Sequence, residues 1–139
     1  MGQPAATDLS PALVERVGTI CLGLPGAHEH DAWIGVSWRI RQRTFAHLAR
    51  VEAPDGLVFG RDVPVDPPVD VITFRSTGDE LDAMLHGGFP FYKPRWHPQV
   101  VGMVLTPALD WVELRELLTE SYCLLAPLRL ARQVQRPSG

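Results

Sequence analysis

Cysteine is scarce in this sequence, which contains only Cys21 and Cys123. Each lies in an apolar stretch with helical spacing, and no short cysteine motif joins them. Buried, unpaired thiols are typical of proteins in a reducing compartment. The sequence therefore predicts a cytoplasmic protein without disulfides. A reactive thiol is the less favoured alternative, because neither cysteine lies in an exposed, basic setting.

Long hydrophobic runs are also missing. No apolar run approaches the roughly 20 residues that cross a bilayer as a helix, so we expect no membrane partner. The first eight residues lack both the basic start and the apolar core of a signal peptide. We expect residues 1–9 to be a disordered lead and residues 10–136 to form one monomeric domain. A chain of 139 residues can bury a core without a metal, cofactor or disulfide.

A strong excess of one charge is absent too. The formal net charge of −3 argues against a protein that coats nucleic acid indiscriminately, because phosphate neutralisation drives such binding. The charges are nevertheless unevenly placed. Residues 38–50 contain four arginines and no acid, whereas residues 52–82 contain eight acids and two arginines. A basic stretch therefore lies beside an acidic one.

Periodicity and capping signals predict the order of the elements. Ser10 and Pro11 are typical of a helix start, so we expect a helix over residues 11–23. Alternating side chains then predict a strand from Ala32 through Gln42, a tight turn near residues 42–44 and a second strand. The expected later strands are a short piece at 57–59, a strand at 69–74 and a strand at 99–105. Two further helices are expected to begin at the N-caps Thr77 and Asp110. A last helix is expected to begin at Pro127, with Leu128, Ala131 and Val134 facing inward.

This order places several consecutive strands between helices. It predicts an α+β fold, in which an antiparallel sheet carries helices packed on one face. The acidic segment between the strands, residues 60–68, is rich in proline and is expected to be a loop. We find no internal repeat in the sequence and no linker long enough to divide the chain.

Three stretches of the sequence together carry a family resemblance. They are Leu24-Pro25-Gly26-Ala27 with Trp33 and Phe45-Ala46, then Trp96 with the run from Val100 to Leu105, and then Leu109 to Leu114 with Ser121-Tyr122. In this order and spacing they resemble the MmcQ/YjbR family over about residues 11–126. The resemblance implies a CyaY-like fold, like that of bacterial frataxin. It also implies binding of double-stranded DNA by a "double wing" of projecting hairpins.

The basic stretch supplies the first candidate site. On one strand Arg39, Arg41 and Arg43 would share a face with a spacing of about 6.6 Å, from a rise of ~3.3 Å per residue. Such a ladder suits a run of phosphates, because the arginine fork pairs well with phosphate oxygens. The equally weighted alternative is a solvated strand face paired with acids of a neighbouring strand.

An aromatic and basic loop at residues 89–98 supplies the second candidate site. Lys93 and Arg95 alternate with proline and tryptophan there and are candidate phosphate contacts. The aromatic groups are more simply explained as cover for a core edge. If they instead line a pocket for a small molecule or a protein partner, the candidate lining residues are Trp33, Trp38, Phe91, Tyr92 and Trp96.

Catalytic and metal signals are weak. His28 and His30 would share a face if they lay on a strand, but no third ligand with suitable spacing follows, so we expect no metal site. No phosphate loop, dinucleotide fingerprint or nucleophile elbow is present. Ser121 lies late in a helix and is expected to be a packed, hydrogen-bonded hydroxyl. The sequence therefore favours a non-catalytic DNA-binding protein, with a small-molecule or protein-interaction domain as the alternative.

Overall fold

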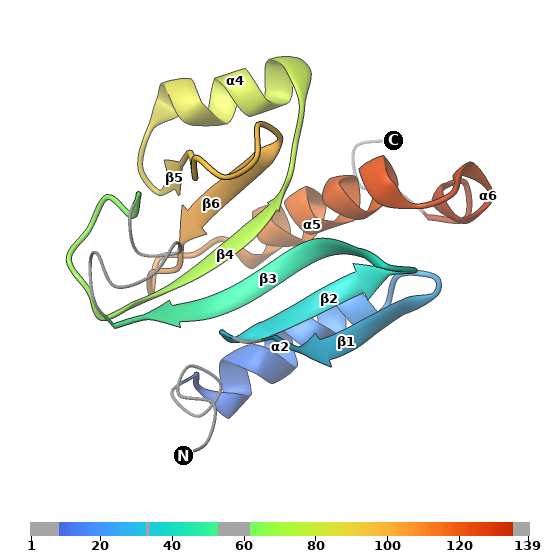
Figure 1. The fold of residues 1–139 in the computed structure, drawn as a ribbon, viewed down its shortest axis with the longest axis horizontal. Helices are drawn as coiled ribbons and strands as arrows, with labels where there is room; N and C mark the ends of the chain where they lie inside the picture. The colour runs from blue at the N-terminus through green and yellow to red at the C-terminus, as the bar shows by residue number, and fades with distance from the viewer. Residues whose placement is uncertain (1–8, 33, 53–61, 135–139) are drawn as a thin grey trace.

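The centre of the molecule is a six-stranded antiparallel sheet. The computed structural model describes residues 9–32, 34–52 and 62–134. The strands lie in the order β1-β2-β3-β4-β6-β5 (Figure 1). Their bounds are β1 Ala27–Asp31, β2 Val36–Ile40, β3 Arg43–Val51, β4 Val69–Arg75, β5 Phe91–Tyr92 and β6 Val100–Val104. The helices within the described residues are α2 Pro11–Leu22, α4 Gly78–Gly87, α5 Trp111–Leu125 and α6 Leu128–Ala131. The predicted α+β fold is confirmed.

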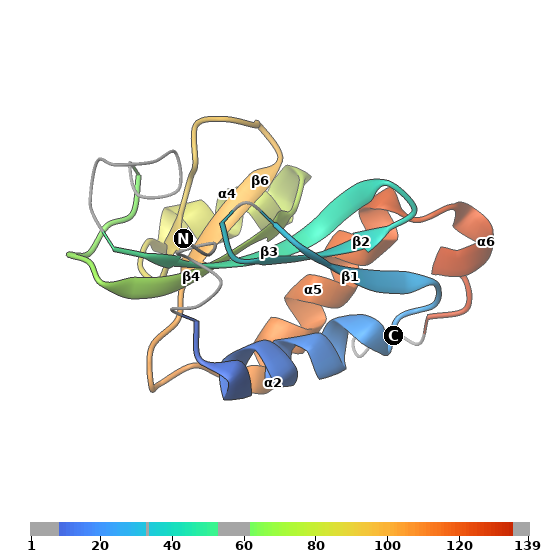
Figure 2. The same cartoon turned by 60° about the horizontal axis from the view of Figure 1, so that its bottom comes forward.

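Two helices cover one face of this sheet. Figure 2 shows α2 and α5 side by side beneath it, and we call this side the helix face. The main core lies here, and its largest fully buried side chains include Trp38, Phe45, Leu118 and Tyr122. Helix α4 instead lies along the edge formed by β5 and β6 (Figure 1). We call the opposite side the open face, and none of the described helices covers its centre.

Local signals explain where the two main helices begin. The Ser10 hydroxyl accepts a hydrogen bond from the Leu13 N–H at 3.4 Å, so the predicted N-cap of α2 is confirmed. Asp110 caps α5 by accepting from the N–H groups of Val112 and Glu113 at 3.0 and 3.2 Å. Thr77 precedes α4 but its side chain makes no capping bond, so the capping box predicted there is wrong.

The β2–β3 hairpin corrects the prediction for the basic stretch. Strand β2 ends at Ile40 and β3 begins at Arg43, so Arg41 and Gln42 form a two-residue turn. Two-residue hairpins favour a positive φ in the turn, and Arg41 adopts φ 57° without a glycine or asparagine to announce it. The predicted single strand through Gln42 is therefore wrong, and the three arginines do not form one ladder.

The ends of the sheet and chain hold further differences. Strands β1 and β5 were not expected as strands, and both are short edge strands that carry little periodicity. Helix α6 spans only four residues, and Leu128 is 64% exposed where it was expected to face inward. The predictions for residues 1–8, Trp33, residues 57–59 and residues 135–136 lie outside the described residues. No described helix is long and apolar enough to cross a membrane.

Candidate functional site

A serine of α5 bridges the two central strands, β3 and β4, at the point where the site lies. Strands β3 and β4 pair from Val51 and Val69 up to Ala46 and Phe74. Beyond that pair, the N–H of Arg75 donates to the Ser121 hydroxyl at 2.8 Å, and this hydroxyl donates to the Phe45 carbonyl at 2.6 Å. Ser121 thus satisfies two backbone groups that would otherwise pair directly. The strands can diverge here without unpaired backbone groups.

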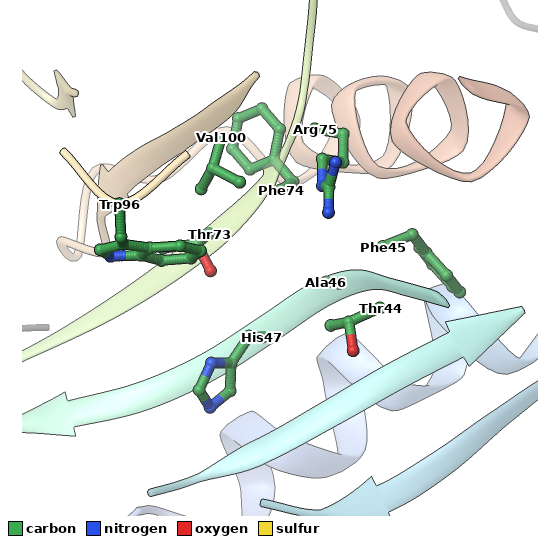
Figure 3. A pocket seen from close by; sticks show the side chains of 9 residues that line it. All are labelled: Thr44, Phe45, Ala46, His47, Thr73, Phe74, Arg75, Trp96 and Val100. Carbon is green, nitrogen blue, oxygen red and sulfur yellow. The ribbon is translucent and has the colours of Figure 1, made fainter. Parts of the chain in front are cut away.

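A cavity of about 210 Å³ lies on the open face over this divergence (Figure 3). Its lining residues are Thr44, Phe45, Ala46, His47, Thr73, Phe74, Arg75, Trp96 and Val100. The Phe45 and Phe74 side chains pack in the main core, so these two residues line the cavity with backbone. Polar side chains come from β3 and β4, and the indole of Trp96 lies across Thr73 as an apolar wall.

Arg75 is the cationic group of the cavity. It is half-buried at the end of β4, and its guanidinium points into the space between β3 and β4 (Figure 3). Burial lowers the pKa of Arg75, and the charge of Arg43 lowers it further. Within the described residues no carboxylate forms an ion pair with Arg75. The cavity therefore has a positive side that no acid in the described part of the chain neutralises.

His97 stands next to this arginine. Its Nε2 is 3.3 Å from a terminal nitrogen of Arg75, and its Nδ1 is 3.0 Å from the backbone N–H of Gln99. A neutral imidazole has one accepting nitrogen, so it can satisfy only one of these two donors. Burial lowers the pKa of His97, and the charges of Arg75 and Lys93 lower it further. One of the two donors, from Arg75 or from Gln99, therefore faces the protonated nitrogen of His97 and has no acceptor there.

His47 is the second imidazole near the cavity. Its Nε2 donates to the Ile34 carbonyl, because a carbonyl can only accept. Burial is the main cause that lowers the pKa of His47, although this hydrogen bond opposes the shift. His47 is therefore held neutral and in one orientation at the floor of the cavity.

The predicted arginines lie around the same end of the sheet. Arg39 is half-buried on β2, opposite Thr44, and its Nε is buried without a hydrogen-bond partner among the described residues. Arg41 and Arg43 are exposed at the hairpin turn and at the start of β3. Arg43 is close enough to Arg75 to lower its pKa. In the described part of the chain, none of the three arginines forms an ion pair.

The other two predicted basic residues are engaged within the protein. The Lys93 ammonium donates to the Pro94 carbonyl at 2.6 Å and to the His97 carbonyl. Arg95 donates to Asp62 through its Nε at 3.0 Å and a terminal nitrogen at 2.6 Å. The Arg95 backbone N–H also donates to Asp62, at 3.1 Å. These contacts hold the loop that carries Trp96.

The described members of the predicted aromatic pocket do not come together, and Trp33 lies outside the described residues. Trp38 is fully buried in the main core on the helix face, where its Nε1 donates to Glu29 at 2.9 Å. Tyr92 belongs to a smaller core cluster on the open face, and Phe91 packs against the main one. Trp96, at 42% exposed, is the one member that lines the cavity among those described. The sequence alone could not tell which face of the sheet each aromatic side chain occupies, because the positions of β2 and β5 were not known.

His28 and His30 share one face of β1, where they lie opposite Arg39 and Ser37 of β2. His30 Nε2 lies 2.7 Å from His28 Nδ1, and His28 Nε2 donates to the Arg41 carbonyl at 2.9 Å. This chain of bonds ties β1 to the hairpin turn. The described residues contain no group of three or more side chains placed to hold a metal ion.

Sequence reasoning missed Arg75 as a site residue. It lies in the acid-rich segment, whose average charge hid it. The predicted strand ended at residue 74, whereas β4 extends to Arg75. One more residue in the prediction would have placed Thr73 and Arg75 on one face. The divergence of β3 and β4 had no such signal, because Ser121 is 76 residues from Phe45 in the chain.

Comparison with known proteins adds one finding. A family model described as YjbR matches residues 22–124, which run from the last residue of α2 almost to the end of α5 and include all residues of the cavity. No curated protein matches the chain.

Proposed function

The chain belongs to the YjbR family, as its sequence resemblance predicted, and from this premise we propose that it is a non-catalytic protein that binds double-stranded DNA. The observation that carries the proposal is the cluster of Arg39, Arg41, Arg43 and Arg75. All four residues lie at one end of the sheet, in or next to the β2–β3 hairpin and at the end of β4, and no ion pair neutralises them among the described residues. We call them the basic cluster.

The ion pairs found among the described residues support this choice of surface. Arg50 pairs with Glu52 at 3.0 Å and with Asp70 at 3.2 Å, and Arg95 pairs with Asp62. These three acids thus neutralise cations away from the hairpin. Arginine guanidinium groups contact phosphate oxygens well, and such contacts position a protein on a duplex without reading its sequence. The proposal therefore involves little direct base readout.

The proposal assigns no catalytic step to this surface. A serine nucleophile needs a base within reach and a third group that orients that base. Ser121 uses its hydroxyl on the Phe45 carbonyl and the Arg75 N–H instead. A cytoplasmic, monomeric state remains the expectation that accompanies the proposal.

Salt dependence is the signature that tests the proposal. Four phosphate contacts give a slope of log K against log salt of roughly −3.6, so affinity should fall about 150-fold between 50 and 200 mM salt. We would titrate a fluorescent 20-base-pair random duplex at several salt concentrations and follow its anisotropy. Binding that is absent at 50 mM, or insensitive to salt, would overturn the proposal.

A matched pair of variants locates the surface. Arg41→Gln with Arg43→Gln removes two exposed charges of the basic cluster. Arg129→Gln with Arg132→Gln removes two exposed charges at α6 instead, so the net charge changes equally. The first pair should weaken binding at least tenfold at 50 mM salt and the second pair much less. Equal losses would mean that net charge, and not this surface, is responsible.

A further inference from the structure

The cavity at Arg75 combines unsatisfied donors with a positive charge. His97 can accept from only one of its two neighbouring donors, at 3.0 and 3.3 Å. If Gln99 keeps its hydrogen bond to Nδ1, then Nε2 carries the proton and faces a donor of Arg75. Two donors that point at each other are both satisfied when an anionic oxygen lies beside them. This geometry indicates an oxyanion.

The half-burial of Arg75 strengthens the same conclusion. A guanidinium withdrawn from water loses solvation, which a carboxylate or phosphate normally compensates. No described acid pairs with Arg75, and Arg43 adds repulsion. An oxyanion bound at this position would supply the missing negative charge. Arginine presents its donors in a fixed fork, which fits the two oxygens of a carboxylate or phosphate.

The rest of the cavity suits a flat ring. The Trp96 indole points toward Thr73 (Figure 3), and Val100, which is almost completely buried, lines the same cavity. Aromatic surfaces stack against other rings with an attraction beyond simple burial. Thr44 and Thr73 add hydroxyl groups on the strand side. The volume of about 210 Å³ is below the ~300–1,000 Å³ of pockets for drug-sized ligands, so the occupant is small.

We propose that this cavity binds a small aromatic oxyanion, with its carboxylate or phosphate on Arg75 and His97 and its ring against Trp96. The ligand could be a free aromatic acid or the phosphorylated end of a nucleotide, which share this chemistry. The cavity shares Arg75 with the basic cluster, but Arg39, Arg41 and Arg43 do not line it. The proposal therefore does not require that the protein binds DNA.

The test uses uniformly ¹⁵N-labelled protein and benzoate as the probe. Amide and indole N–H resonances are followed by NMR during the titration. Benzoate should shift the Trp96 indole N–H and the amides of Thr73 and Arg75. Benzamide has the same shape without the charge and should bind at least tenfold more weakly. Cyclohexanecarboxylate keeps the charge without the flat ring and should also bind more weakly.

A second arm distinguishes the two sources of the ligand. Phenyl phosphate replaces benzoate in the same titration. Tighter binding of phenyl phosphate would assign the site to a phosphorylated nucleotide end, and tighter binding of benzoate would assign it to an aromatic acid. Either result supports an oxyanion site.

Variants link the binding to the cavity. Arg75→Gln should weaken benzoate binding at least tenfold, whereas Arg129→Gln on α6 should leave it unchanged. The same spectra show whether each variant remains folded, and the comparison of benzoate with benzamide needs no variant. The proposal is overturned if neither anion shifts the Trp96 indole, or if benzamide binds as well as benzoate. Arg41→Gln with Arg43→Gln should retain benzoate binding, so this result separates the cavity from the DNA surface.

Discussion

Replacing Ser121 with alanine removes the hydroxyl that bridges the diverging strands. That hydroxyl is fully buried, accepts from the Arg75 N–H at 2.8 Å and donates to the Phe45 carbonyl at 2.6 Å. Alanine differs from serine by a single oxygen atom, so packing in α5 changes little. The substitution therefore leaves two backbone groups of β3 and β4 without their partner.

The expected cost follows from those two groups. A buried donor or acceptor that loses its partner costs about 1–3 kcal/mol. Two such groups would cost about 2–6 kcal/mol, and partial closure of the strands recovers some of it. We therefore expect Ser121→Ala to lower the free energy of unfolding by about 2–4 kcal/mol. Closure would also shrink the cavity above the strands, so benzoate binding should weaken in the folded variant.

Urea denaturation followed by circular dichroism measures this change. Thr119→Val is the matched control, because Thr119 is also buried on α5 and its hydroxyl donates to the Arg115 carbonyl at 2.7 Å. That carbonyl belongs to the helix's own hydrogen-bond ladder, so losing the hydroxyl should cost under about 1 kcal/mol. A Ser121→Ala variant as stable as Thr119→Val would refute the bridging role.

Three further predictions concern other parts of the fold. Gly102→Ala would place a Cβ 2.2 Å from the Tyr92 ring, so it should lower the free energy of unfolding by about 1–3 kcal/mol. Urea denaturation measures this change, and an unchanged free energy of unfolding would contradict the close contact. Burial lowers the pKa of His47 in the folded protein below its unfolded value of about 6.5. The neutral His47 therefore stabilises the fold above pH 6.5, and this stabilisation is lost as the pH falls through the lower folded pKa. The wild type should lose more stability than His47→Gln between pH 7.5 and pH 5. Asp62→Asn should release Arg95 for one more phosphate contact and make the salt slope of DNA binding steeper by up to about 0.9, whereas an unchanged slope would exclude Arg95 from the interface.

Much of the fold was predictable because its signals are local. Ser10 and Asp110 cap α2 and α5 as their sequence positions indicate, and the apolar spacing of α5 buries Leu114, Leu118 and Tyr122 together. Strand β4 also forms where its apolar run predicts. In these places the hydrophobic pattern and the capping residues both follow from a few neighbouring positions.

The features that escaped prediction depend on distant contacts. The turn at Arg41 has a positive φ without glycine or asparagine, and the His28 side chain supports it from another strand by donating to the Arg41 carbonyl. The separation of β3 and β4 depends on Ser121, which comes from the last long helix. Lys93 and Arg95 looked available in the sequence, but backbone carbonyls and Asp62 engage them.

The most direct test of the proposed function is the salt slope of DNA binding for the wild type and for Arg41→Gln with Arg43→Gln. Each lost phosphate contact reduces the magnitude of the slope by about 0.9, so the double variant should be shallower by about 1.8. The Arg129→Gln with Arg132→Gln control should retain the wild-type slope. A double variant with an unchanged slope would contradict the assignment of the β2–β3 hairpin as the DNA-binding surface.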